Sequence, residues 1–183
     1  MDKRLKLKIA KEDRGMAAVE FAIILPVLLL TLIGLFDIAN FAYCHNKMNR
    51  TAQEINNIVT RGNVTKPQLD GLLRASALIA QPFDFTTSGN VIVTSVAVVN
   101  ANQGAQIMWR DSYPGGVGGS LINPASLPGG LVLNTNQTAI FTEVFFTYTP
   151  LITSYIVSSN QTKIYALAAG MPRQGQMTTL PSS

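Results

Sequence analysis

The sequence of 183 residues has one cysteine, Cys44, and one histidine, His45. A single cysteine excludes an intramolecular disulfide, so the folded part must depend on its hydrophobic core. The two residues are adjacent, and neighbouring side chains on a helix point about 100° apart, so they do not form a nucleophile–base pair. A metal site would need further ligands. We therefore expect that the protein is not an enzyme and that it binds no cofactor and no metal. An intermolecular disulfide through Cys44 is an alternative role for this residue.

Charged residues are also scarce, at 13% of the chain, and they are unevenly distributed. Residues 1–15 have six Lys/Arg and three Asp/Glu, which leaves +3 of the total net charge of +4. The remaining residues have no run of basic side chains of the kind that binds nucleic acid. Asp111 and Glu143 are among the few acidic residues that follow, and no spacing marks them as a catalytic pair. The leader charge is better explained as a membrane topology signal.

A long apolar run is present near the N-terminus. Residues 16–36 have one charged side chain, Glu20. As a helix these 21 residues extend roughly 31 Å at about 1.5 Å per residue, which matches a hydrocarbon core of roughly 30 Å. A secretory signal has an apolar region of only about 7–15 residues and then a cleavage site of small residues, which this sequence lacks. We expect a retained single span, with the basic leader in the cytoplasm and the chain from about residue 43 exported.

Two residues within the run are unusual. An ionised Glu20 inside an apolar helix costs several kcal/mol unless it is paired or close to the interface. The simpler interpretation is that Glu20 lies at the cytoplasmic interface beside Arg14. Pro26 cannot donate a hydrogen bond to the carbonyl of Ala22, so we expect a kink. The kink either gives flexibility during extraction from the bilayer or has no function.

The segment Gly15-Met16-Ala17-Ala18-Val19-Glu20-Phe21 resembles two known patterns. With Gly34–Asn40 and Asn49–Glu54 it resembles the TadE-like family of tight-adherence (Flp/type IVb) pilus proteins, over roughly residues 14–57. Asp37 stands where that family more often has Glu. The same segment resembles the processing site of type IV pilin precursors. The resemblance implies cleavage after Gly15 by a prepilin peptidase, with Met16 as the new N-terminus.

The function implied by this resemblance is that of a minor pilin or pseudopilin in pilus assembly and surface attachment. Its implied partners are the prepilin peptidase, the major Flp pilin, other TadE/TadF-like subunits, the inner-membrane assembly platform and the lipid bilayer. The new Met16 ammonium would be neutralised by Glu20, followed by Phe21, of a neighbouring subunit. The implied location is the bacterial inner membrane, with the C-terminal domain in the periplasm or, after assembly, in the pilus at the cell surface. The alternative is an uncleaved single-span protein with a periplasmic scaffolding or binding domain.

Apolar periodicity predicts an α+β domain after the span. A stripe of Phe41, Met48, Ala52, Ile55 and Val59 continues the helix, so that 16–60 forms one long helix. A second, short helix begins around Thr65, with Pro67 in its first turn, and reaches about residue 79. Alternating or β-branched runs predict antiparallel strands over 91–99, 105–110, 138–149 and 163–169. The exported domain is expected over 61–172.

Two segments have no periodic pattern. The Gly/Pro-rich stretch 111–137 is expected to be a loop, which either contacts other subunits or is disordered. The C-terminal tail 173–183 is expected to be flexible.

Overall fold

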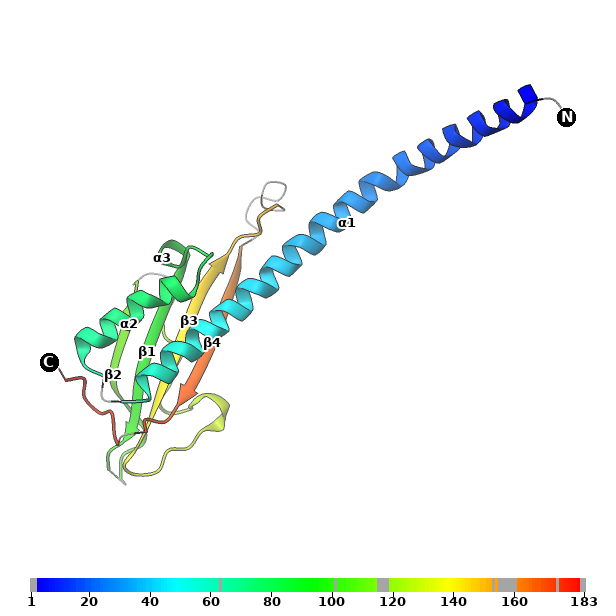
Figure 1. Cartoon of the computed structure of the whole chain (residues 1–183). Helices are drawn as coiled ribbons and strands as arrows, with labels where there is room; N and C mark the ends of the chain where they lie inside the picture. The colour runs from blue at the N-terminus through cyan, green and yellow to red at the C-terminus, as the bar shows by residue number, and fades with distance from the viewer. Residues whose placement is uncertain are drawn as a thin grey trace. The chain divides into compact units, whose positions relative to one another are not determined.

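The structure is a computed structural model that describes residues 3–62, 64–100, 102–114, 119–152, 154, 161–173 and 175–181, with backbone alone for 3–14. Three helices and four strands follow one another as α1 (Lys3–Val59), α2 (Lys66–Ile79), α3 (Phe85–Ser88), β1 (Gly89–Val98), β2 (Gln106–Tyr113), β3 (Gln137–Tyr148) and β4 (Thr162–Gly170) (Figure 1). A 3-10 turn, η1 (Pro128–Gly130), lies between β2 and β3. The strands form one antiparallel sheet in the order β2-β1-β3-β4, which confirms the predicted α+β fold.

The chain divides into two compact units. The first contains residues 1–40 and 150–160, and the second contains residues 41–149 and 161–183. Helix α1 contributes to both. It ends one residue before the predicted boundary, but it begins at Lys3 and not at Met16. The leader continues the helix because it is rich in Lys, Arg and Leu, which favour helix, and because Gly15 alone costs only about 1 kcal/mol there.

The core of the second unit lies between the helices and one face of the sheet. On α1, the side chains of Cys44, Met48, Ala52, Ile55 and Val59 are all 0% exposed, which confirms the predicted stripe. Leu69 and Leu73 of α2 join the same cluster, as do alternate residues of the sheet: Val91, Val93, Ile140, Val144, Ile164 and Ala166. Because both helices cover this face, the strands present apolar residues toward them.

Asn56 connects α1 to the sheet through hydrogen bonds. It is 4% exposed, and its amide can donate to the carbonyl of Ile140 at 3.1 Å and accept from the N–H of Gly170 at 3.2 Å. A Cβ at position 170 would lie 2.7 Å from the terminal amide atom of Asn56 that faces it. Gly170 therefore allows the helix to approach the end of β4.

Helix α2 is fixed at its N-terminus. The Gln68 side chain accepts a hydrogen bond from the N–H of Thr65 at 3.0 Å. This backbone donor has no acceptor within the helix itself. Lys66 forms ion pairs with Asp70, at 2.7 Å, and with Asp111 of β2. The predicted start of this helix is confirmed, and the ion pair to Asp111 connects it to the edge of the sheet.

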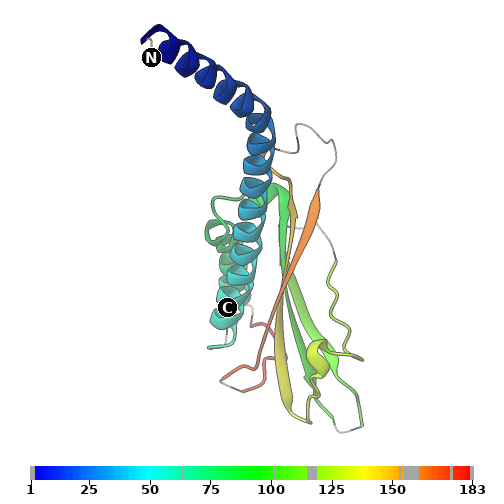
Figure 2. The ribbon, with the colours of Figure 1, turned by 90° about the vertical axis from the view of Figure 1, so that its right-hand side faces the viewer.

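The opposite face of the sheet is covered by the chain between β2 and β3 (Figure 2). Ile122, Leu127 and Leu133 of this segment are 5–8% exposed and pack on Val96 and Val98 of β1 and Ala139 and Phe141 of β3. The described part of the expected loop, 119–136, is thus an irregular layer and not a disordered one; residues 115–118 lie outside the described residues. β1 is buried on both faces for this reason.

Glu143 holds this layer against the sheet. Its carboxylate is 0% exposed and accepts hydrogen bonds from the hydroxyl of Ser120 at 2.5 Å, the N–H of Leu121 at 2.8 Å and the hydroxyl of Tyr165 at 3.1 Å. Burial and the Glu143 charge raise the pKa of Tyr165 above its usual value, so its hydroxyl stays protonated. A buried carboxylate is tolerated where donors satisfy it in this way.

The C-terminal segment packs on the sheet although it has no helix or strand. Met177 is 3% exposed, and its carbonyl accepts hydrogen bonds from the hydroxyl of Ser95 at 2.6 Å and from the indole N–H of Trp109 at 2.9 Å. The carbonyl of Pro181 accepts from the N–H of Lys66 at 2.8 Å. The described part of the tail is therefore fixed to the domain, unlike the flexible tail expected over 173–183.

Substituting Ile55→Ala is expected to lower the free energy of unfolding by about 2–5 kcal/mol, because a fully buried side chain is removed from the core. Ile58→Ala, on the same helix but 41% exposed, is the matched control and should change it by about 0.5 kcal/mol or less. Denaturant titration of the detergent-solubilised chain, followed by Trp109 fluorescence, measures both. Equal effects would contradict the packing described.

Substituting Glu143→Ala is expected to cost about 1–3 kcal/mol, because Ser120, Leu121 and Tyr165 lose their acceptor. Glu54→Ala is the control, since that carboxylate is paired with Arg50 on the helix surface and such pairs contribute little. Limited proteolysis should also cut residues 119–136 faster in the Glu143 variant. Unchanged stability and unchanged cleavage would show that Glu143 does not hold this layer.

Candidate processing and assembly segment

The predicted processing bond lies within a helix. Gly15 and Met16 are both helical residues of α1, both are exposed, and a Cβ added to Gly15 would meet no atom within 4 Å. Proteases bind their substrates in extended form, so the helix must unwind locally before cleavage. Glycine weakens a helix by about 1 kcal/mol relative to alanine, which makes unwinding easier at this position.

Glu20 is exposed on α1, among apolar side chains that are also exposed. Met16, Val19 and Phe21 are 61–65% exposed. Met16 and Glu20 are four residues apart and so lie on one face of the helix, one turn from each other. The side chain of Arg14, the predicted neighbour of Glu20, lies outside the described residues. Among the side chains described, no ion pair involves Glu20.

The apolar part of α1 has the properties of a membrane span. The helix is long and apolar enough to cross a bilayer, and only 6% of its most apolar stretch is buried. A core helix of a soluble protein would be mostly buried. The exposed side chains are large and apolar: Phe21, Ile23, Ile24, Val27, Leu28, Leu29, Leu30, Leu32, Leu35 and Phe36. This stretch fits a single-pass membrane protein.

Pro26 lies inside α1, and Figure 2 shows the helix bent in its blue, N-terminal part. The missing N–H of proline removes one hydrogen bond of the helix, which is the usual cause of such a bend. Five residues on, the hydroxyl of Thr31 donates to the carbonyl of Val27 at 2.8 Å. The polar group of Thr31 is thus satisfied within the helix, as hydrocarbon requires.

Asp37 was not predicted as a site residue. The sequence analysis noted only that it stands where the TadE-like family more often has Glu. It is 7% exposed, although its neighbours Phe36 and Ile38 are 49% and 65% exposed. Its carboxylate accepts a hydrogen bond from the N–H of Ile152 at 3.2 Å. The sequence feature that could have identified Asp37 is its position as the first charged residue after the apolar run.

The other candidates do not form a catalytic site. Cys44 is buried in the core at 0% exposure, whereas His45 is exposed and contacts the amide of Asn49 at 3.1 Å. An intermolecular disulfide through Cys44 is inconsistent with this burial. Asp111 pairs with Lys66, and Glu143 binds the opposite layer, so the two carboxylates are separated. No cluster of metal-ligating side chains occurs among the described residues.

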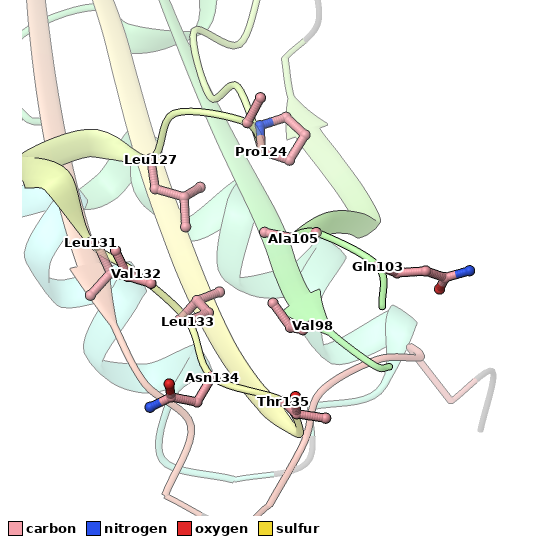
Figure 3. Close-up of a pocket in the computed structure, with 12 residues that line it drawn as sticks. Val98, Gln103, Ala105, Pro124, Leu127, Leu131, Val132, Leu133, Asn134 and Thr135 are labelled. Carbon is pink, nitrogen blue, oxygen red and sulfur yellow. The ribbon is translucent and has the colours of Figure 1, made fainter. Parts of the chain in front are cut away.

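A pocket of about 400 Å³ lies between the covering layer and the ends of β1 and β2 (Figure 3). Its apolar lining includes Val98, Ala105 and Leu131, and Gln103 and Asn134 contribute amides. Pockets of this size accommodate small ligands or a partner's side chain. The lining has no charged residue, so the pocket does not indicate a particular ligand.

A protein-family model described as TadE-like protein matches residues 15–55. The match begins at Gly15 and includes Glu20, Pro26 and Asp37, and it confirms the resemblance inferred from the sequence. It covers α1 but none of the sheet. No curated protein and no solved structure matches the chain. The TadE-like segment indicates a role in the tight-adherence pilus system, in a chain with one helix able to cross a membrane.

Proposed function

We propose that the chain is a minor pilin or pseudopilin of a tight-adherence (Flp/type IVb) pilus, processed after Gly15 by a prepilin peptidase and supporting surface attachment. One observation carries the proposal. Within the TadE-like segment, the carboxylate of Glu20 is exposed among apolar side chains and lies one helical turn from Met16. A carboxylate in such a position requires a partner of opposite charge.

Cleavage supplies that partner. Removing residues 1–15 creates an α-ammonium at Met16 and removes the six basic side chains of the leader. When two such helices pack side by side, the Met16 ammonium of one subunit pairs with Glu20 of the next, and Phe21 packs beside the pair. Each charge alone is costly in hydrocarbon, and the pair costs less. The pairing therefore favours assembly and fixes the axial register between neighbours.

The orientation follows from charge. The leader keeps its basic side chains in the cytoplasm, so the sheet domain lies in the periplasm of the inner membrane. In the inner membrane its partners are the prepilin peptidase, the assembly platform, the major Flp pilin and other TadE/TadF-like subunits. The exposed apolar side chains of α1 contact both these proteins and the lipid bilayer.

The second candidate is an uncleaved single-span protein whose periplasmic domain has a scaffolding or binding role. The pocket lined by Val98, Ala105 and Leu131 favours it, since a structural subunit needs no such cavity. The two candidates differ in the fate of residues 1–15, which only the first loses.

Gly15→Val should abolish processing, because the branched side chain adds bulk beside the scissile bond, whereas glycine leaves the backbone there unhindered for binding in the protease cleft. Gly34→Val is the matched control, since Gly34 lies on the same helix and also has no atom within 4 Å of an added Cβ. Co-expression with a prepilin peptidase and immunoblotting for the shortened chain measures both. Processing of Gly15→Val at the parental rate would contradict the proposed site.

Glu20→Ala should insert into the membrane as well as the parent but should be lost from the sheared pilus fraction, because the Met16 ammonium of its neighbour is left unpaired. Glu54→Ala, which alters a carboxylate on the exported half of the same helix, should assemble normally. Quantitative immunoblots of carbonate-washed membranes and sheared fibres separate insertion from assembly. If Glu20→Ala enters the fibres at the parental level, the pairing is not required.

A further inference from the structure

The position of Asp37 marks the outer end of the span. The uncharged stretch Phe21–Phe36 has 16 residues, which as a helix extend roughly 24 Å, and extension back to Gly15 gives roughly 33 Å. A hydrocarbon core of roughly 30 Å therefore ends close to Asp37. A carboxylate is expected at this depth, where headgroups and water begin.

Pro150–Ile152, which follow β3, lie close to Asp37. The N–H of Ile152 donates to the Asp37 carboxylate at 3.2 Å, and residues 150–160 form one compact unit with the first 40 residues. Asp37 is much less exposed than the helix residues on either side of it. Since Ile152 is within hydrogen-bonding distance of a residue at the bilayer boundary, Ile152 must also be at that boundary.

The chemistry of this connection suits a lipid surface. Leu151 is 57% exposed beside the bonded Ile152, and the sequence has no charged residue from Val144 to Thr162. Pro150 has no N–H that would need a partner there. The Asp37–Ile152 hydrogen bond satisfies the Ile152 N–H at the edge of the hydrocarbon core, inside which a backbone donor needs a partner from the protein.

We propose that Pro150–Ile152 is a second membrane contact of the exported chain, with Leu151 inserted at the boundary between headgroups and acyl chains of the outer leaflet. Asp37 is the positioning residue that holds this connection at the depth where the helix leaves the bilayer. The contact depends on the span and not on cleavage after Gly15, so it would be present in an uncleaved protein as well. Its test is therefore independent of the proposed pilin function.

The test uses the full chain in vesicles of phosphatidylethanolamine with phosphatidylglycerol as the minor lipid. Leu151→Cys, in a Cys44→Ala background, is labelled with an environment-sensitive fluorophore. Val132→Cys is the matched control, because Val132 is 80% exposed on the layer covering the sheet. Lipids spin-labelled near the headgroup report contact with the membrane, and iodide reports contact with water.

The expected result is a blue-shifted emission at position 151 and quenching by the spin-labelled lipid severalfold stronger than at position 132, with weaker quenching by iodide. Equal lipid and iodide quenching at the two positions would overturn the proposal. Near-UV circular dichroism of each labelled chain confirms that the sheet domain is folded.

The role of Asp37 is tested by two further variants of the Leu151→Cys chain. Asp37→Ala removes the acceptor for Ile152 and should reduce lipid quenching at position 151 toward the level at position 132. Asp37→Asn retains a side-chain carbonyl and should preserve most of the quenching. If Asp37→Ala leaves the quenching unchanged, Asp37 does not position the connection.

Discussion

The cost of a charged group in hydrocarbon is the constraint on which the N-terminal half of this molecule depends. Two carboxylates, Glu20 and Asp37, bracket 16 uncharged residues on α1 and so define where the helix can lie in a bilayer. Asp37 is satisfied within the chain by Ile152. Glu20 shows no ion pair among the described side chains, and its proposed partner belongs to another subunit. This difference is the basis of the two proposals, an anchor at Asp37 and an assembly contact at Glu20.

The same helix serves two environments. Its first part exposes apolar side chains to lipid, and from Cys44 to Val59 one stripe is buried against the sheet. Two polar side chains buried in the domain, Asn56 at the end of β4 and Glu143 beneath the covering layer, have specific hydrogen-bond partners. These bonds fix the irregular parts of the domain, where apolar packing alone would allow several arrangements.

Hydrophobic patterning predicted the long helix, the short helix α2 and all four strands, because each of them packs apolar side chains into the core. It did not predict the layer 119–136 or the packed tail, since irregular segments have no period and their contacts are distant in sequence: Met177 bonds Ser95, 82 residues away. The helical leader was not predicted, because the predicted helix began at Met16, the first residue after the implied cleavage site. The site at Gly15 and Glu20 is predicted from the resemblance to known pilins, and no geometry within one chain identifies the partner of Glu20.

The mass of the mature protein tests the central claim most directly. Intact-mass and N-terminal peptide analysis of the chain, purified from the membranes and from the sheared fibres of cells that express its own pilus system, reports where it begins. The account predicts a chain that begins at Met16 in the fibres and a mixture of both forms in the membrane. A chain that retains Met1 through Gly15 in every fraction would contradict it.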